Sequence, residues 1–154
     1  MIPELGHFAL ILALCVAVVQ GVLPIAGAAR GQGAWMALAR PAALAQCALV
    51  ALAFGCLAQA FIANDFSVLY VAQHSNTRLP LAYRFAGVWG GHEGSLLLWT
   101  LMLGFWSIAV AAFSRHLPER MVARVLGVMA LVSVGFLAFM LFTSNPFERI
   151  FPPA

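Results

Sequence analysis

The sequence predicts an all-α, polytopic integral membrane protein with four transmembrane helices. Hydrophobic residues make up 64% of the 154 residues and charged residues only 8%, with a mean hydropathy of +0.97. Such a chain has too little polar surface to cover a water-soluble globule. Four stretches also exceed the length of about 18 apolar residues that crosses a hydrocarbon core of about 30 Å. Transmembrane strands need only about 10 residues of alternating polarity, so these runs indicate helices.

The four helices are expected over about 5–29, 41–63, 96–113 and 121–142, in a single membrane domain. Pro24 lies near the end of the first, where neighbouring helices can absorb a kink. Pro41 opens the second, at a position where the missing N–H of proline costs nothing. Small residues recur in that helix at three- and four-residue spacing, and they predict a flat face that another helix can approach closely. These residues are Ala48, Ala51, Gly55 and Ala58.

Orientation follows from arginine, because the chain contains no lysine. Five arginines lie in or beside the connections between the first and second and between the third and fourth helices: Arg30, Arg40, Arg115, Arg120 and Arg124. Three lie on the other side: Arg78, Arg84 and Arg149. The positive-inside rule therefore places both termini and the loop over 64–94 in the periplasm. The start "MIPELGH" lacks a basic residue, so the first helix is expected to be a retained span rather than a cleavable signal peptide.

Composition disfavours several classes of function. The net charge of +3 comes from single arginines at helix ends, which topology explains better than nucleic-acid binding does. Three cysteines, Cys15, Cys47 and Cys56, lie inside expected helices and are interpreted as packing residues. No C-x-x-C-H motif occurs, so the chain is not itself a c-type cytochrome. Apart from Arg124, the last three helices contain no charged side chain, which disfavours a small transporter.

The loop over 64–94 is the polar segment that can hold a site. Besides the motif described next, its candidate residues are Asp65, His74, Arg78 and Arg84. Its aromatic residues, among them Tyr70, Tyr83 and Trp89, are interpreted mainly as anchors at headgroup level. The alternative is a shelf that lies partly in the membrane and holds an amphipathic ligand or an extended partner chain.

The block "WGGHEGS" at the end of this loop supplies the candidate positioning residues: Trp89, Gly90, Gly91, His92, Glu93, Gly94 and Ser95. Its glycines allow backbone conformations that other residues avoid, and so a sharp turn. Ser95 is expected to be the N-cap of the third helix, with Glu93 beside the positive end of the helix dipole. His92 has three interpretations, a metal or haem ligand, a proton shuttle, or a hydrogen-bonding group of the loop, and the last is favoured. No catalytic residue and no metal site are predicted.

The remaining histidines indicate no haem site within the bundle. His7 and His74 are expected on the outer side and His116 on the inner side. Axial haem ligands in a helical bundle come from its interior, and none of these lies near mid-membrane. The four helices alone therefore do not resemble a b-type cytochrome.

Four blocks, in order and spacing, resemble the N-terminal part of CcmF: "NDFSVLYVAQHSNT", "WGGHEGSLLLW", "VARVLGVMALVSVGF" and "FTSNPFERIFP". CcmF is the haem lyase subunit of bacterial and some mitochondrial cytochrome c maturation systems. The resemblance implies a haem-handling membrane protein of the group that includes CcmC and CcsA, with its N-terminus outside the cytoplasm. It also implies the bacterial inner membrane rather than a mitochondrial one.

The chemistry implied by the resemblance is covalent attachment of haem to apocytochrome c. The thiols of a C-x-x-C-H motif add across the haem vinyl groups, with haem received from the chaperone CcmE and the apoprotein presented by CcmH. CcmF proteins also carry a tryptophan-rich segment and haem-ligating histidines beyond the region matched here, and none of the four histidines matches such a ligand. The chain is therefore expected to be a fragment of a longer product or one piece of a divided protein, with haem bound mainly elsewhere.

The expected role is that of a membrane component of the haem lyase. In this reading the four helices pack against the haem-bearing remainder, and the outer loop helps to shape the periplasmic face. A scaffold or interaction module without haem contact is the alternative, and a small transporter is less favoured.

Overall fold

The computed structural model describes residues 2–31, 33–63, 68–74, 80–89, 91–114, 116–143 and 146–147. Its architecture is all-α. Four helices are long and apolar enough to cross a membrane. These are α1 (Ile2–Arg30), α3 (Ala39–Ile62), α6 (His92–Phe113) and α7 (Glu119–Phe142). The predicted fold class and number of spans are confirmed.

The segment predicted as a loop over 64–94 contains helical pieces. These are α4 (Leu69–His74), α5 (Leu81–Ala86) and the 3-10 helix η1 (Gly87–Trp89). A further short helix, α2 (Gly33–Met36), connects α1 to α3. Val68, Val71 and Val88 are completely buried, so α4 and η1 pack against the bundle. Hydropathy over a long window missed them because each is short and has few apolar residues to bury.

Helix α6 begins at His92, four residues before the predicted start at Leu96. The prediction followed the apolar run, which marks the hydrocarbon part of a helix. The polar first turn belongs to the same helix and lies at its interfacial end.

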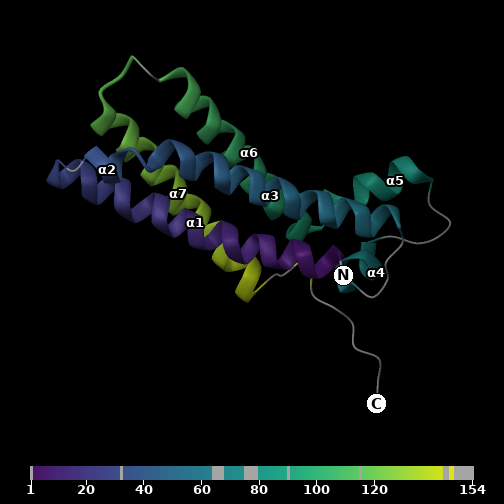
Figure 1. Ribbon diagram of the computed structural model, residues 1–154. Coiled ribbons are helices and arrows are strands. Elements are labelled where there is room, and N and C mark those ends of the chain that lie inside the picture. The colour runs from purple at the N-terminus through teal and green to yellow at the C-terminus, as the bar shows by residue number, and fades with distance from the viewer. Residues whose placement is uncertain are drawn as a thin grey trace.

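The four long helices form a ring in which α1 and α6 each pack against both α3 and α7 (Figure 1). Helices α1 and α7 approach closely at two glycines. A Cβ added at Gly127 would lie 2.5 Å from Ile25 Cγ1, and one added at Gly21 would lie 2.7 Å from Leu131 Cδ2. Small residues permit such close approach between membrane helices.

Beside this crossing, the side chain of Gln20 is completely buried. Its Nε2 donates a hydrogen bond to Leu126 O at 2.9 Å. Its Oε1 has no hydrogen-bond partner within the described residues. The amide thus ties α1 to α7 through one hydrogen bond, which its nitrogen donates.

The two ends of the bundle differ in content. The N-terminus lies at the same end as α4 and α5, and α2 lies at the opposite end with the α6–α7 connection (Figure 1). This is the arrangement that the predicted topology requires, while the side of the membrane that each end faces stays a prediction. At the α2 end, Arg40 Nε donates to Ala111 O at 3.0 Å, placing a cation at the C-terminal end of α6, where the helix dipole favours it.

The predicted small-residue face of α3 is not covered by another described helix. Ala48, Ala51 and Gly55 are exposed, and only Ala58 is buried. A Cβ added at Gly55 would meet nothing within 4 Å. Helix α3 packs within the bundle through another face: Ala43, Cys47, Val50, Ala53 and Leu57. Spacing of small residues identified a smooth face but not the side that the bundle uses.

Candidate functional site

The entrance to α6 is organised by one buried hydroxyl group, that of Tyr70 in α4. Tyr70 is 2% exposed. Its Oη donates to Val88 O at 2.9 Å, and Gly91 N–H donates to Tyr70 Oη at 2.9 Å. The carbonyls of Gly91 and Gly87 lie at 3.3 and 3.4 Å from the same oxygen. A single side chain thus holds the chain before and after the turn; we call Tyr70 and residues 87–94 the Tyr70 turn.

The ring of Tyr70 joins this turn to α3. It packs edge to face on Phe61, with the ring centroids 5.4 Å apart and an interplanar angle of 72°. Phe61 is completely buried at the end of α3. Burial raises the pKa of the Tyr70 hydroxyl; backbone hydrogen bonds at Gly91 and Gly94 oppose this rise, and the charge of Glu93 adds to it. The hydroxyl therefore remains protonated and available as a donor at neutral pH.

Position 94 has no room for a side chain, so it requires glycine. A Cβ added there would overlap Val88 O and lie 2.5 Å from Tyr70 Oη. The prediction that glycines supply unusual backbone conformations here is wrong for Gly91 and Gly94, and Gly90 lies outside the described residues. Gly91 has an extended backbone, with φ −105° and ψ 171°, which any residue adopts. Among the glycines that the structure describes, only Gly31 has a positive φ.

The N-cap of α6 is Gly91, so the prediction of Ser95 is wrong. Ser95 N–H donates to Gly91 O at 3.0 Å, which places Ser95 one full turn inside the helix. Tyr70 Oη accepts the Gly91 N–H, so the amide of the N-cap residue is paired by a side chain from another helix. Glu93 lies in the first turn, near the positive end of the helix dipole, as expected.

The other predicted residues are placed only in part. Four belong to described helices without a described side chain: His74, Arg84, Trp89 and His92. Three lie outside the described residues: Asp65, Arg78 and Gly90. Tyr83 is 67% exposed, which fits a headgroup anchor, whereas the buried Tyr70 contradicts that interpretation. Among the described residues, no three of the types His, Cys, Asp and Glu gather as metal ligands.

A second sequence block lies at the same end of the bundle. Phe147, from "SNPF", is 4% exposed. A Cβ added at Gly6 would lie 2.5 Å from Phe147 Cζ and 2.9 Å from Cys56 Cβ, so Phe147 packs where α1 and α3 meet. Sequence reasoning interpreted Tyr70 as a headgroup anchor and assigned no packing role to Phe147 at this end. The signal for Tyr70 was its place inside the apolar run "VLYV", away from charged neighbours.

Known proteins are similar to this chain over nearly its whole length, including the Tyr70 turn. A family model described as "Cytochrome C assembly protein" matches residues 89–154, starting within the Tyr70 turn. "Cytochrome c-type biogenesis protein CcmF" of Pseudomonas aeruginosa is 63% identical over 152 residues, covering 99% of this chain and 23% of that protein. CcmF of Escherichia coli K12 is 53% identical over 152 residues, covering 99% of this chain and 24% of that protein.

A more distant relative and a solved structure agree with these. "Cytochrome c-type biogenesis protein NrfE" of Haemophilus influenzae is 40% identical over 152 residues, covering 99% of this chain and 24% of that protein. The solved structure "Cytochrome c Heme Lyase CcmF" superposes with a TM-score of 0.91 at 28% identity, covering 96% of this chain and 25% of that one. The chain thus spans about a quarter of the length of the relatives that it matches.

Proposed function

The chain belongs to the CcmF family of cytochrome c-type biogenesis proteins, and we propose that it acts as a membrane component of a cytochrome c haem lyase. In this role it assists the covalent attachment of haem to apocytochrome c at the periplasmic face of a bacterial inner membrane. The remainder of the lyase, CcmH and the haem chaperone CcmE are its expected partners. The observation that carries the proposal is the Tyr70 turn, which one buried hydroxyl holds at the mouth of α6.

The chemistry needs positioning more than it needs reactive groups from this chain. Each apocytochrome thiol adds across a haem vinyl group, so that sulfur bonds to one vinyl carbon and hydrogen to the other. Both reactants come from outside the chain, whose three cysteines lie within α1 and α3. Misplacement by about 1 Å can cost about a hundredfold in rate, so a surface that holds reactants in register contributes strongly.

The Tyr70 turn has the properties of such a surface. The hydroxyl of Tyr70 bonds to the backbone on both sides of the turn, and Gly94 lets η1 lie directly against α6. His92 is the first residue of α6 and therefore takes its position from this arrangement. We propose that the turn packs beneath the haem or apocytochrome site and sets its position.

The decisive experiment replaces His92 with alanine in the full-length protein. We expect His92→Ala to lower the yield of covalently haem-bearing cytochrome c, with protein abundance and bound haem nearly unchanged. Tyr83→Ala is the matched control, because Tyr83 is aromatic, 67% exposed and outside the turn. Normal maturation in His92→Ala would reduce the turn to a helix start. Loss of bound haem would instead make His92 a ligand.

The proposed orientation has its own test. In a version without the three native cysteines, Tyr83→Cys lies at the end proposed to be periplasmic and Leu117→Cys at the opposite end. A membrane-impermeant thiol reagent should label only Tyr83→Cys until the inner membrane is broken. The reverse pattern would overturn the orientation.

The haem content of residues 1–154 alone separates direct binding from positioning. We expect these residues, purified in detergent, to bind less than stoichiometric haem, because the family's haem ligands lie elsewhere. A Soret band near one haem per chain that vanished in His92→Ala would contradict this expectation.

A scaffold without haem contact remains the second candidate, and the exposed face of α3 favours it. Ala48, Ala51 and Gly55 offer a smooth surface to which a partner helix can dock. Purification of the tagged full-length protein distinguishes the two functions, since partners that co-purify without haem favour the scaffold.

A further inference from the structure

Two tryptophans point outward from one face of α6. Trp99 is 61% exposed and Trp106 is 66% exposed. They are seven residues apart, so they lie on the same face, two turns from each other. At about 1.5 Å per residue, Trp99 lies about 9 Å inside the Glu93 end of the span and Trp106 about 10 Å inside the Phe113 end. Both Cα atoms are thus deeper than the headgroup level at which tryptophan is usually found.

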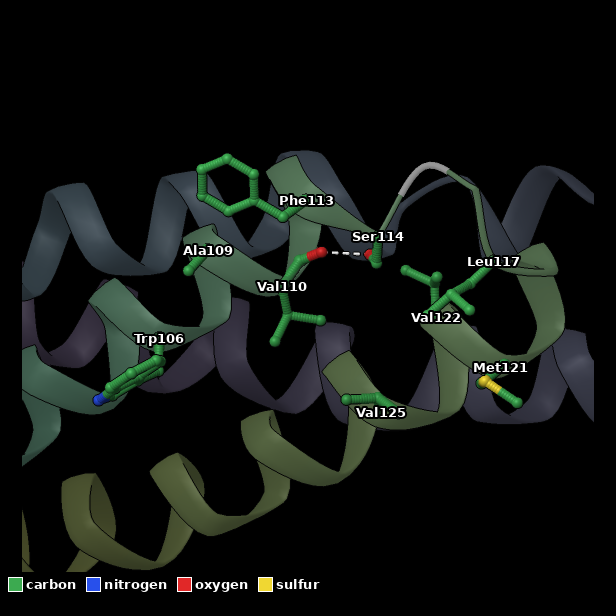
Figure 2. Close-up of a pocket in the computed structure, with 9 residues that line it drawn as sticks. All are labelled: Trp106, Ala109, Val110, Phe113, Ser114, Leu117, Met121, Val122 and Val125. Atoms are coloured by element: carbon green, nitrogen blue, oxygen red, sulfur yellow. Dashed lines mark hydrogen bonds between the residues drawn. The ribbon is translucent and has the colours of Figure 1, made fainter.

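The indole N–H of Trp106 lies deeper in the membrane than that of Trp99. Helical side chains lean toward the N-terminus of their helix, so Trp106 leans toward the middle of the membrane, whereas Trp99 leans toward its nearer end. Figure 2 shows the ring nitrogen of Trp106 on the side of the ring away from Ser114. Lipid tails offer no acceptor to such a donor, and an unpaired donor in hydrocarbon is costly. Within the described chain no hydrogen bond reaches either indole.

The same surface carries two hollows along the seam between α6 and α7. The first, of about 430 Å³, has Trp106, Val110 and Phe113 on one side and Met121 and Val125 on the other (Figure 2). The second, of about 420 Å³, lies between Leu96 and the segment of α7 around Gly135. A Cβ added at Gly135 would meet nothing within 4 Å, so this glycine leaves room for a side chain from outside. We call this surface the α6–α7 face, defined by Leu96, Trp99, Trp106, Val125, Gly135 and Phe139.

We infer that the α6–α7 face is the docking surface for another membrane-spanning helix of the same, longer polypeptide. Large side chains of that helix fill the two hollows, and one of its oxygen atoms accepts the Trp106 N–H. The inference rests on the proposed function, in which this chain is part of a full-length haem lyase. The chain covers 23% of its Pseudomonas aeruginosa relative, which leaves about three quarters of that protein's length to supply the helix.

The outer face of α3 provides the contrast. Its exposed residues include Leu44, Leu52 and Gly55, and none of these side chains has a polar group that needs a partner. Lipid tails can cover the stretch of this face from Leu44 to Gly55 at no hydrogen-bonding cost, and the exposed Gln59 lies in the last turn of α3, at the end of the span. Both faces point away from the bundle, but only the α6–α7 face carries an indole N–H that needs a hydrogen-bond acceptor.

Photo-crosslinking in native membranes tests the inference. A benzophenone amino acid replaces Trp106 in the full-length protein, and in a matched control it replaces Leu52. After irradiation, the Trp106 position should link to a peptide of the same polypeptide outside residues 1–154, and the Leu52 position mainly to lipid. Lipid adducts alone at the Trp106 position, a link to a different protein, or a link to a second copy, detected by mixing isotopically heavy and light protein, would each overturn the inference.

A second variant tests the hollows. Gly135→Leu fills the space reserved for the docking helix, so it should lower the crosslink yield at the Trp106 position several-fold, while Gly55→Leu on α3 should leave it unchanged. An unchanged yield in Gly135→Leu would contradict docking over this hollow. Cytochrome c maturation is measured in parallel. Crosslinks to lipid alone, with normal maturation, would contradict the docking inference but not the proposed function. A crosslink within the polypeptide, without any maturation activity, would contradict the proposed function but not the docking inference.

Discussion

Two buried polar side chains, Tyr70 and Gln20, show how differently the two parts of this molecule satisfy a polar group. At the end of the bundle, the Tyr70 hydroxyl donates to Val88 O and accepts from Gly91 N–H. In the middle of α1, the Gln20 amide donates to Leu126 O, and its Oε1 has no partner among the described residues. The hydroxyl both donates and accepts a hydrogen bond, whereas the amide only donates one.

The difference follows from which backbone groups each region leaves available. A helix start has N–H groups without an intrahelical partner, and a 3-10 turn leaves free carbonyls, so the hydroxyl of Tyr70 finds both an acceptor and a donor. Inside α1 and α7 every N–H is engaged along the helix, and only the second lone pair of a carbonyl remains. The Gln20 N–H group finds that lone pair, but its oxygen finds no donor. Polar anchoring is therefore complete at the turn and partial within the span.

The largest effect should come from Gly94→Ala. The added methyl group overlaps Val88 O and must push η1 away from α6. Overpacking of this kind costs about 1–3 kcal/mol or more, and a shift of about 1 Å at the turn can cost about a hundredfold in maturation rate. Haem staining of c-type cytochromes measures the loss. Gly33→Ala, where an added Cβ meets nothing within 4 Å, is the control, and equal maturation in both variants would show that the tight packing at Gly94 is unimportant.

Tyr70→Phe should have the next largest effect. It keeps the ring on Phe61 but leaves the Gly91 N–H and Val88 O without their shared partner, at a cost of about 1–3 kcal/mol. Limited proteolysis at residues 80–91 should accelerate, and the thermal midpoint in detergent should fall. Tyr83→Phe, at an exposed tyrosine, should change neither. A stable Tyr70→Phe turn would mean that the ring alone holds it.

Gln20→Met should have a small effect, within about 1 kcal/mol of the free energy of unfolding. The substitution removes one hydrogen bond and one unpaired oxygen together, and replacing a polar group by an apolar one of similar shape can be nearly neutral. Thermal unfolding in detergent compares it with Tyr70→Phe. A larger loss than in Tyr70→Phe would reverse the comparison and indicate that Gln20 Oε1 binds a water molecule or another partner.

The smallest effect is expected from pH. The raised pKa of Tyr70 means that the folded turn favours the neutral hydroxyl. Its contribution is present below the usual tyrosine value of about 10 and is lost only as pH rises through the higher folded value. Proteolysis of the turn should therefore be the same at about pH 7 and about pH 9, once corrected for protease activity with Tyr70→Phe. A loosening between these values would show that the hydroxyl ionises early.

Much of the fold follows from the sequence because hydropathy is a local quantity. Each span contains enough consecutive apolar residues to cross a bilayer whatever its neighbours are, so the number of spans and their approximate bounds needed no tertiary information. The blocks that resemble CcmF were likewise readable along the chain. The prediction that the N-terminus and the outer loop share one end followed from counting spans.

Other properties depended on which surfaces meet, and one-dimensional patterns do not contain that information. The spacing of Ala48, Ala51 and Gly55 identified a smooth face, but packing against α1 and α6 turned the other side of α3 inward. The sequence predicted that Tyr70 is a headgroup anchor, but in the structure α4 packs its ring on Phe61. The need for glycine at Gly94 comes from Val88, a residue of a different element.

The sequence by itself therefore determined the spans, the polar end that holds the candidate site and the family, since each depends on residues read in order along the chain. Only the tertiary structure decided that α6 begins at His92 with Gly91 as its N-cap, that one hydroxyl holds its entrance and that Trp106 faces outward at membrane depth. The physical reason is that hydrophobic transfer acts on each segment separately, whereas hydrogen bonding and close packing need two segments at a defined distance.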